Sequence, residues 1–131
     1  MTDIAGLIER LEAAAELDAQ LFYDIATNVY PAAFPAVWIL DKETADWRFR
    51  TLDCLIGAKA WESAALALVE RVRPGWCWRA EKCPPTYLGP RGEPFWATCG
   101  PPGEQEAAHG PTPAIALLIA LLKSLETTND A

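Results

Sequence analysis

The sequence predicts an α+β fold, in which a short antiparallel sheet of three to four strands packs with three main helices. Two observations predict the helices: apolar residues recur at helical spacing near 3–29 and 53–72, and a very apolar segment follows Thr112-Pro113. The third observation is a Trp-rich segment whose residues alternate as in a β-strand. A chain of 131 residues, 51% of them hydrophobic and 22% charged, is typical of one globular domain, here 1–131.

The N-terminal third is predicted to form a helix at 3–29 and a hairpin at 36–51. Asp3 is a suitable N-cap, and Pro31 cannot continue a helix. After it, Val37–Leu40 and Trp47–Thr51 are rich in β-branched and aromatic residues and flank a polar loop. A short helical extension is the competing interpretation of this hairpin.

Two further helices are expected at 53–72 and 112–126. Gly57 weakens the first, which leaves open one helix or two, the second starting near Trp61. Thr112 supplies an N-cap hydroxyl, and Pro113 suits the first helical position. The helix that follows is apolar nearly all round, so we expect it to be sandwiched in the core or buried by a partner chain. Residues 100–110 are predicted as a loop, and the last six as a frayed tail.

Between these helices, a Trp-rich hairpin is predicted at 75–99. Trp76 and Trp78 would share one face of the first strand, with Arg79 on the other face. Pro84-Pro85 ends that strand, and a proline-rich connection leads to a returning strand that contains Trp96. This segment also concentrates positive charge in an otherwise acidic chain.

Charge and hydropathy exclude several classes of partner. The formal net charge is −7, whereas binding to long nucleic acids needs a broad basic face. The longest apolar run, Ala114–Leu122, is about half the length that crosses a bilayer. The first residues lack the pattern of a signal peptide, so we expect a cytoplasmic protein with free thiols.

No residue pattern predicts a catalytic or metal site. Cys77, Cys83, Cys99 and His109 have the side chains of a zinc site, but no Cys-x-x-Cys pair is present. His109 is the only histidine, and no nucleophile motif surrounds either serine. Prolines interrupt the Gly-containing loops and remove amide donors that a phosphate would need. We therefore expect no metal, no cofactor and no enzymatic activity.

Three pieces of the last 80 or so residues resemble small hypothetical proteins of tailed phages and prophages, of the phage ABA-sandwich type. They are the pattern Leu52, Asp53, Ile56, Lys59 and Trp61, the passage Ser63–Trp78, and the closing segment Thr112–Leu125. This chain departs from that type in its longer N-terminal half and longer Pro-rich loop. The resemblance implies a sheet packed with helices and an accessory role for a phage or prophage in the host cytosol. It implies no reaction.

Aromatic and cationic residues of the Trp-rich hairpin are the predicted ligand site. A planar base would stack on tryptophan, and a phosphate would meet a guanidinium group or the free amides at Thr112. The first functional hypothesis is a non-enzymatic accessory protein that sequesters a small nucleotide signal of host anti-phage defence. The alternative is a protein-interaction module acting on a host or phage protein, and a small hydrolase has least support. Homo-oligomerisation is also expected. The predicted binding residues are Trp76, Trp78, Arg79, Tyr87, Arg91, Trp96 and Thr112.

Overall fold

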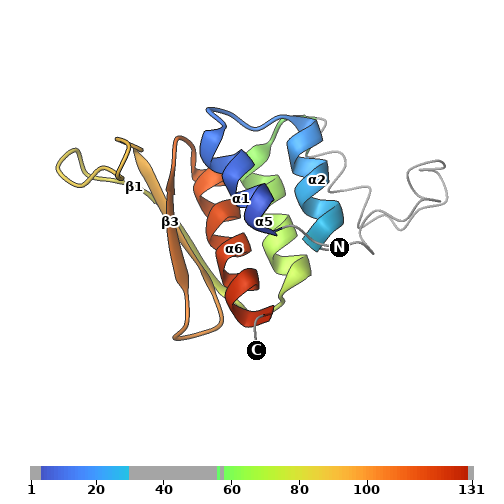
Figure 1. Ribbon diagram of the computed structural model, residues 1–131. Helices are drawn as coiled ribbons and strands as arrows, with labels where there is room; N and C mark the ends of the chain where they lie inside the picture. The colour runs from blue at the N-terminus through green and yellow to red at the C-terminus, as the bar shows by residue number, and fades with distance from the viewer. Residues whose placement is uncertain (1–3, 30–55, 57, 130–131) are drawn as a thin grey trace.

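The computed structural model describes residues 4–29, 56 and 58–129, and it confirms the α+β class. A three-stranded antiparallel sheet lies on one side of the molecule, helix α6 lies against it, and the other helices lie beyond α6 (Figure 1). In chain order the elements are α1 (Ile4–Ala13), α2 (Ala19–Val29), α5 (Trp61–Val72), β1 (Cys77–Lys82), β2 (Phe95–Gly100), β3 (Glu106–Gly110) and α6 (Pro113–Asn129).

The described strands form a sheet of order β1-β2-β3, in which β2 is central and the other two strands are edges. Directly paired residues share a face of the sheet. Trp78 pairs with Cys99, and Ala80 pairs with Ala97, on the face toward α6. Arg79 pairs with Thr98, and Trp96 pairs with both Glu81 and His109, on the opposite face. The predicted hairpin and the alternation of Trp78 with Arg79 are confirmed, but β1 begins at Cys77, so Trp76 precedes the strand in which it was expected.

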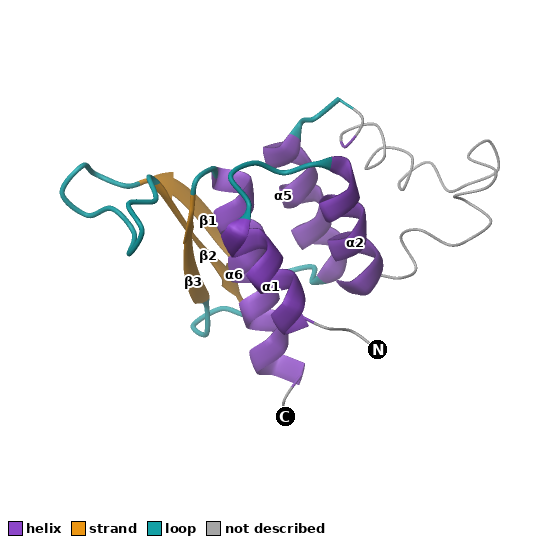
Figure 2. Ribbon diagram, turned by 45° about the horizontal axis from the view of Figure 1, so that its top comes forward, coloured by secondary structure: helices purple, strands orange, loops and turns teal. Residues whose placement is uncertain are grey.

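Helix α6 is the centre of the fold, as its uniform apolarity predicts. Every residue from Ala114 to Leu122 is buried, because α6 contacts the three strands on one side and α1 and α5 on the other (Figure 2). Thr112 caps the helix, since its hydroxyl accepts a hydrogen bond of 3.2 Å from the Ile115 amide. Packing where β3 meets the start of α6 is close: a Cβ atom on Gly110 would lie 2.8 Å from the Ala116 nitrogen.

The N-terminal segment is two helices, which corrects the single helix predicted at 3–29. The second begins after Asp18, whose carboxylate accepts a hydrogen bond of 2.8 Å from the Leu21 amide. An Asp in the middle of an amphipathic pattern thus acts as an N-cap. The two helices are joined by an ion pair of 2.9 Å between Arg10 and Asp24. The ring of Phe22 stacks with that of Trp61, 6.0 Å between centroids, and so packs α2 on α5.

Three further predictions can be compared with the structure. Helix α5 begins at Trp61, as the two-helix alternative for 53–72 has it, and Lys59 just before it has φ +58°. The loop predicted at 100–110 contains β3, because pairing with β2 supports a strand of weak intrinsic propensity. Helix α6 continues beyond the predicted end at 126 to Asn129. The hairpin predicted at 36–51 lies outside the described residues.

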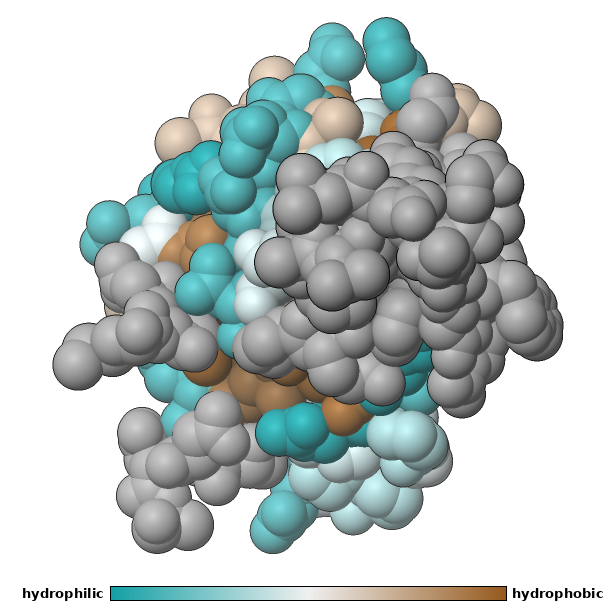
Figure 3. Space-filling model, turned by 90° about the vertical axis from the view of Figure 1, so that its right-hand side faces the viewer, coloured by the Kyte–Doolittle hydropathy of each residue, from teal (hydrophilic) through white to brown (hydrophobic). Residues whose placement is uncertain are grey.

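On the helical side of the molecule, hydrophobic residues show between hydrophilic ones (Figure 3). Among the described residues, no helix combines the length and apolarity needed to cross a membrane.

Candidate functional site

The outer face of the sheet carries an aromatic and cationic cluster at its centre. No helix of the described residues covers this face (Figure 1). Trp96 lies half-buried on the central strand, and the Arg79 guanidinium carbon lies 5.8 Å from its ring centroid. Arg79 also forms an ion pair of 2.6 Å with Glu81, and both side chains are substantially exposed. His109 is the direct partner of Trp96 on β3. We call Arg79, Glu81, Trp96 and His109 the outer-face cluster.

This cluster is arranged for stacking. A tryptophan held by its two neighbouring strands offers a rigid apolar plane, and such a plane accepts bases without regard to their sequence. The Arg79 guanidinium lies over this ring, so a base must share the ring face with it or displace it, and the guanidinium can donate hydrogen bonds to an anion. Glu81 already occupies one side of the guanidinium, so an anionic ligand must compete with a carboxylate of the chain itself.

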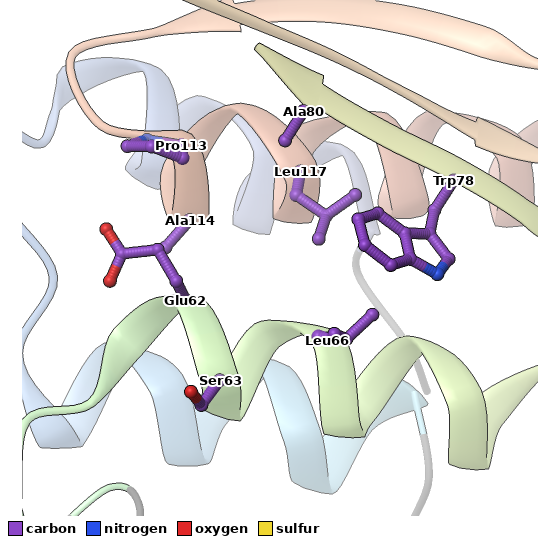
Figure 4. A pocket seen from close by; sticks show the side chains of 8 residues that line it. All are labelled: Glu62, Ser63, Leu66, Trp78, Ala80, Pro113, Ala114 and Leu117. Carbon is purple, nitrogen blue, oxygen red and sulfur yellow. The ribbon is translucent and has the colours of Figure 1, made fainter.

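An apolar groove lies on the other face of the sheet, between β1 and α5. Its volume is about 200 Å³, and α6 forms its back wall (Figure 4). The Trp78 indole and the Leu66 and Leu117 side chains reach into this space from three different elements. Trp78 retains 43% of its surface exposed, which is high for a tryptophan. The residues that line the groove are Glu62, Ser63, Leu66, Trp78, Ala80, Pro113, Ala114 and Leu117.

A polar pocket of about 210 Å³ lies beside β3. The β1–β2 loop reaches this edge, where Arg91 donates a hydrogen bond of 3.3 Å to the Glu12 carbonyl oxygen at the end of α1. Glu93, His109 and Lys123 line the same pocket. Four ionisable side chains from the loop, β3 and α6 therefore meet here, beside Glu12 of α1.

The charge of Glu93 is set by its surroundings in this pocket. Burial alone would raise its pKa, but backbone hydrogen bonds and the charges of His109 and Arg91 outweigh burial and lower the pKa below its ordinary value. One of these hydrogen bonds, 2.6 Å long, comes from the Arg91 amide. Glu93 is therefore ionised at neutral pH and suits an acceptor, whereas a general acid needs a raised pKa.

The predicted binding residues do not converge on one pocket. Arg79 and Trp96 are brought together on the outer face, but Trp78 lies on the opposite face in the groove. Arg91 lies at the β3 edge. Tyr87 lies in the β1–β2 loop with 76% of its surface exposed.

The other two predicted binding residues have local structural contacts. Trp76 packs partly into the core, and the guanidinium of Arg73 lies 5.7 Å from its ring centroid. The Thr112 hydroxyl caps α6, so it already has a hydrogen-bond partner. Four residues of these sites are not among the binding residues predicted from the sequence: Glu81, Glu93, His109 and Lys123. Only the position of Glu81, two residues after Arg79 and therefore on the same face of the predicted strand, could have indicated one of them.

The three described cysteines, Cys77, Cys83 and Cys99, are free thiols. Burial raises the pKa of Cys99 to about 12, with a smaller contribution from Cys77, so its thiol stays protonated. Cys77 is exposed at the start of β1, and Cys83 is buried. Among the described residues, no three His, Cys, Asp or Glu side chains gather closely enough to hold a metal ion.

Comparison with protein-family models, with curated proteins and with solved structures finds no match to the chain.

Proposed function

We propose that this chain is a non-enzymatic binding protein that stacks a planar, base-like ring on Trp96. The observation that carries the proposal is the half-buried Trp96 with the Arg79 guanidinium 5.8 Å from its ring, on a sheet face that no described helix covers. A core tryptophan would face α6, as Cys99 on the same strand does. Trp96 instead faces away from the hydrophobic core, where a ligand can reach it.

The ligand class that fits is a small nucleotide. Its base would stack on Trp96, and its phosphate would displace the Glu81 carboxylate from Arg79. The net charge of −7 opposes a highly charged ligand, so one or two phosphates fit better than a polyphosphate. The resemblance to phage proteins extends the proposal to a cytosolic phage or prophage accessory protein that sequesters a nucleotide signal of host defence.

Thermal unfolding with adenosine and AMP tests this function. A ligand at 100 times its dissociation constant stabilises the native state by about 2.7 kcal/mol. We expect stabilisation of the wild type and its loss in Trp96→Leu. Trp78→Leu is the matched control, because Trp78 lies on the opposite face and its loss leaves the proposed ligand surface intact.

Glu81→Gln sharpens the test, since it removes the carboxylate that competes for Arg79. We expect this variant to bind AMP more tightly than the wild type, with less change for uncharged adenosine. If millimolar nucleotide stabilises neither the wild type nor Glu81→Gln, the proposed ligand class is wrong. Equal loss of binding in Trp96→Leu and Trp78→Leu would instead place the ligand elsewhere.

A second function, protein interaction, is supported by a different observation. Trp78 is exposed over an apolar groove beside an edge strand, and exposed tryptophans of this kind are typical anchors of protein interfaces. This function uses the inner face of the sheet and is independent of the nucleotide proposal.

A further inference from the structure

Within the described part of the chain, strand β1 has an unpaired edge with a defined set of available backbone groups. Among the described residues, β1 pairs with β2 alone. The Cys83 amide bonds to the Pro94 carbonyl oxygen at 2.7 Å, in continuous register with the β1–β2 ladder. In an antiparallel ladder hydrogen-bonded pairs alternate, so odd-numbered residues of β1 bond to β2. The amides and carbonyls of Trp78, Ala80 and Lys82 therefore point outward from the sheet.

The sequence of β1 is complementary to itself when two copies run antiparallel about Ala80. Arg79 then lies opposite Glu81 of the second copy, and Trp78 lies opposite Lys82 of the second copy. Opposite charges directly across a ladder stabilise it, and an ammonium group over an indole adds a cation–π contact. The outward backbone groups match as well, because residues 78, 80 and 82 of one copy lie opposite residues 82, 80 and 78 of the other.

The neighbouring symmetric registers lack this match. A centre at Arg79 places two arginines opposite each other, and a centre at Glu81 places two glutamates opposite each other. Like charges in that position destabilise a ladder. The register about Ala80 also overlaps more of the strand than a centre at Glu81 does, and it places a small residue next to the two-fold axis.

Apolar side chains in the groove beside β1 would also be buried by this pairing. Trp78 and Ala80 point toward the groove, so a second copy would bring its own Trp78 to the same side of the sheet. Leu66 of α5 lies below the edge and is only half-buried in one copy. Pairing through β1 would remove Trp78 and Leu66 from water in both copies, which is a favourable contribution.

We propose that a second copy of this chain pairs with the β1 edge in the register centred on Ala80. The two sheets become one continuous antiparallel sheet, with a two-fold axis between the two Ala80 residues. An unrelated strand would form the same backbone bonds but would meet a charge pattern, Arg79-Ala80-Glu81-Lys82, that natural edges use to discourage pairing. A second strand therefore pairs favourably only when it places an acidic residue opposite Arg79 and a basic residue opposite Glu81. An antiparallel second copy of β1 meets this condition.

Charge exchange at Arg79 and Glu81 tests the proposal. In Arg79→Glu or Glu81→Arg alone, like charges face each other across the axis, and we expect the dimer dissociation constant to rise roughly tenfold or more. When the two single variants are mixed, both glutamates of the first face both arginines of the second, so a heterodimer should regain the affinity of the wild type. The Arg79→Glu/Glu81→Arg double variant should also dimerise alone. Sedimentation velocity measures all four samples, and circular dichroism checks their fold.

Ala80→Pro provides a second test that leaves the charges in place. The Ala80 amide points away from β2, so proline removes no bond of the β1–β2 ladder but blocks the free edge. We expect a folded monomer. A wild-type chain that stays monomeric at high micromolar concentration would overturn the proposal. So would a mixture of the single variants that associates no better than either one, or a dimer that persists in Ala80→Pro. The Ala80→Pro variant keeps Arg79, Glu81 and Trp96, so nucleotide binding can be measured separately in it.

Discussion

The two edges of the sheet differ in what lies beside them. At β3, the β1–β2 loop, the end of α1 and Lys123 surround the strand with polar groups, and Arg91 ties the loop to Glu12. At β1, the lining is apolar, Trp78 is exposed, and among the described residues the strand has no further partner. An unpaired edge invites association, and proteins usually cover or charge it. Here the long loop lies beside one edge, and the other carries a specific charge pattern.

The largest effect is expected where β3 meets α6. A Cβ atom on Gly110 would lie 2.8 Å from the Ala116 backbone nitrogen, and backbone at a helix start cannot move away cheaply. We expect Gly110→Ala to lower the free energy of unfolding by about 2 kcal/mol. Gly103→Ala is a comparison for backbone strain alone, because a Cβ there meets no atom within 4 Å and only the positive φ of +82° opposes it.

Urea unfolding of both variants measures this difference. A Gly110→Ala variant as stable as the wild type would show that β3 does not depend on close contact with α6. Contacts with the β1–β2 loop and α1 would then be the main source of stability for the β3 edge.

A good part of the fold could be predicted from the sequence, because the relevant signals are local. Thr112-Pro113 fixes the start of α6, and the uniform apolarity of that helix predicts its central position. The break at Asp18 was missed because the apolar spacing continues on both sides of it. β3 was missed because Glu-Ala-Ala-His-Gly has little strand propensity and becomes a strand only by pairing with β2.

The candidate site was predicted less completely, for a different reason. Alternation along one strand places Arg79 and Glu81 on a common face, but it cannot say which residues of β2 share that face. Register decides this, and a slip of one residue would exchange the faces. Trp78 pairs with Cys99, so Trp96 lies on the other side, and the seven predicted residues distribute over separate surfaces.

A smaller effect is expected from Glu93 at the β3 edge. Its pKa in the folded state lies below the ordinary value of 4.5, so the carboxylate stabilises the fold above that value. This contribution is lost as the pH falls through the lowered pKa. Glu93→Gln should therefore be less stable than the wild type at neutral pH, and the difference should shrink on acidification below 4.5.

Urea unfolding at neutral and acidic pH measures this change. Glu62→Gln removes the same charge beside the β1 edge and controls for the altered net charge. A stability difference between Glu93→Gln and the wild type that does not depend on pH would contradict the role given to the Arg91 amide and the charge of His109.

The smallest effect concerns Cys77, the exposed thiol at the start of β1. The fourth cysteine, Cys54, lies outside the described residues and is replaced by serine for this experiment. Iodoacetamide should then modify Cys77 and leave Cys99 unmodified, because burial raises the pKa of Cys99 to about 12. In the register about Ala80, Cys77 lies at the end of the shared ladder, opposite residue 83 of the second copy. Its modification should therefore slow by roughly twofold to threefold as protein concentration rises through the dimer range, in proportion to the fraction paired. Ala80→Pro should abolish this concentration dependence. A rate that depends on concentration equally in both proteins would show that association occurs away from the β1 edge.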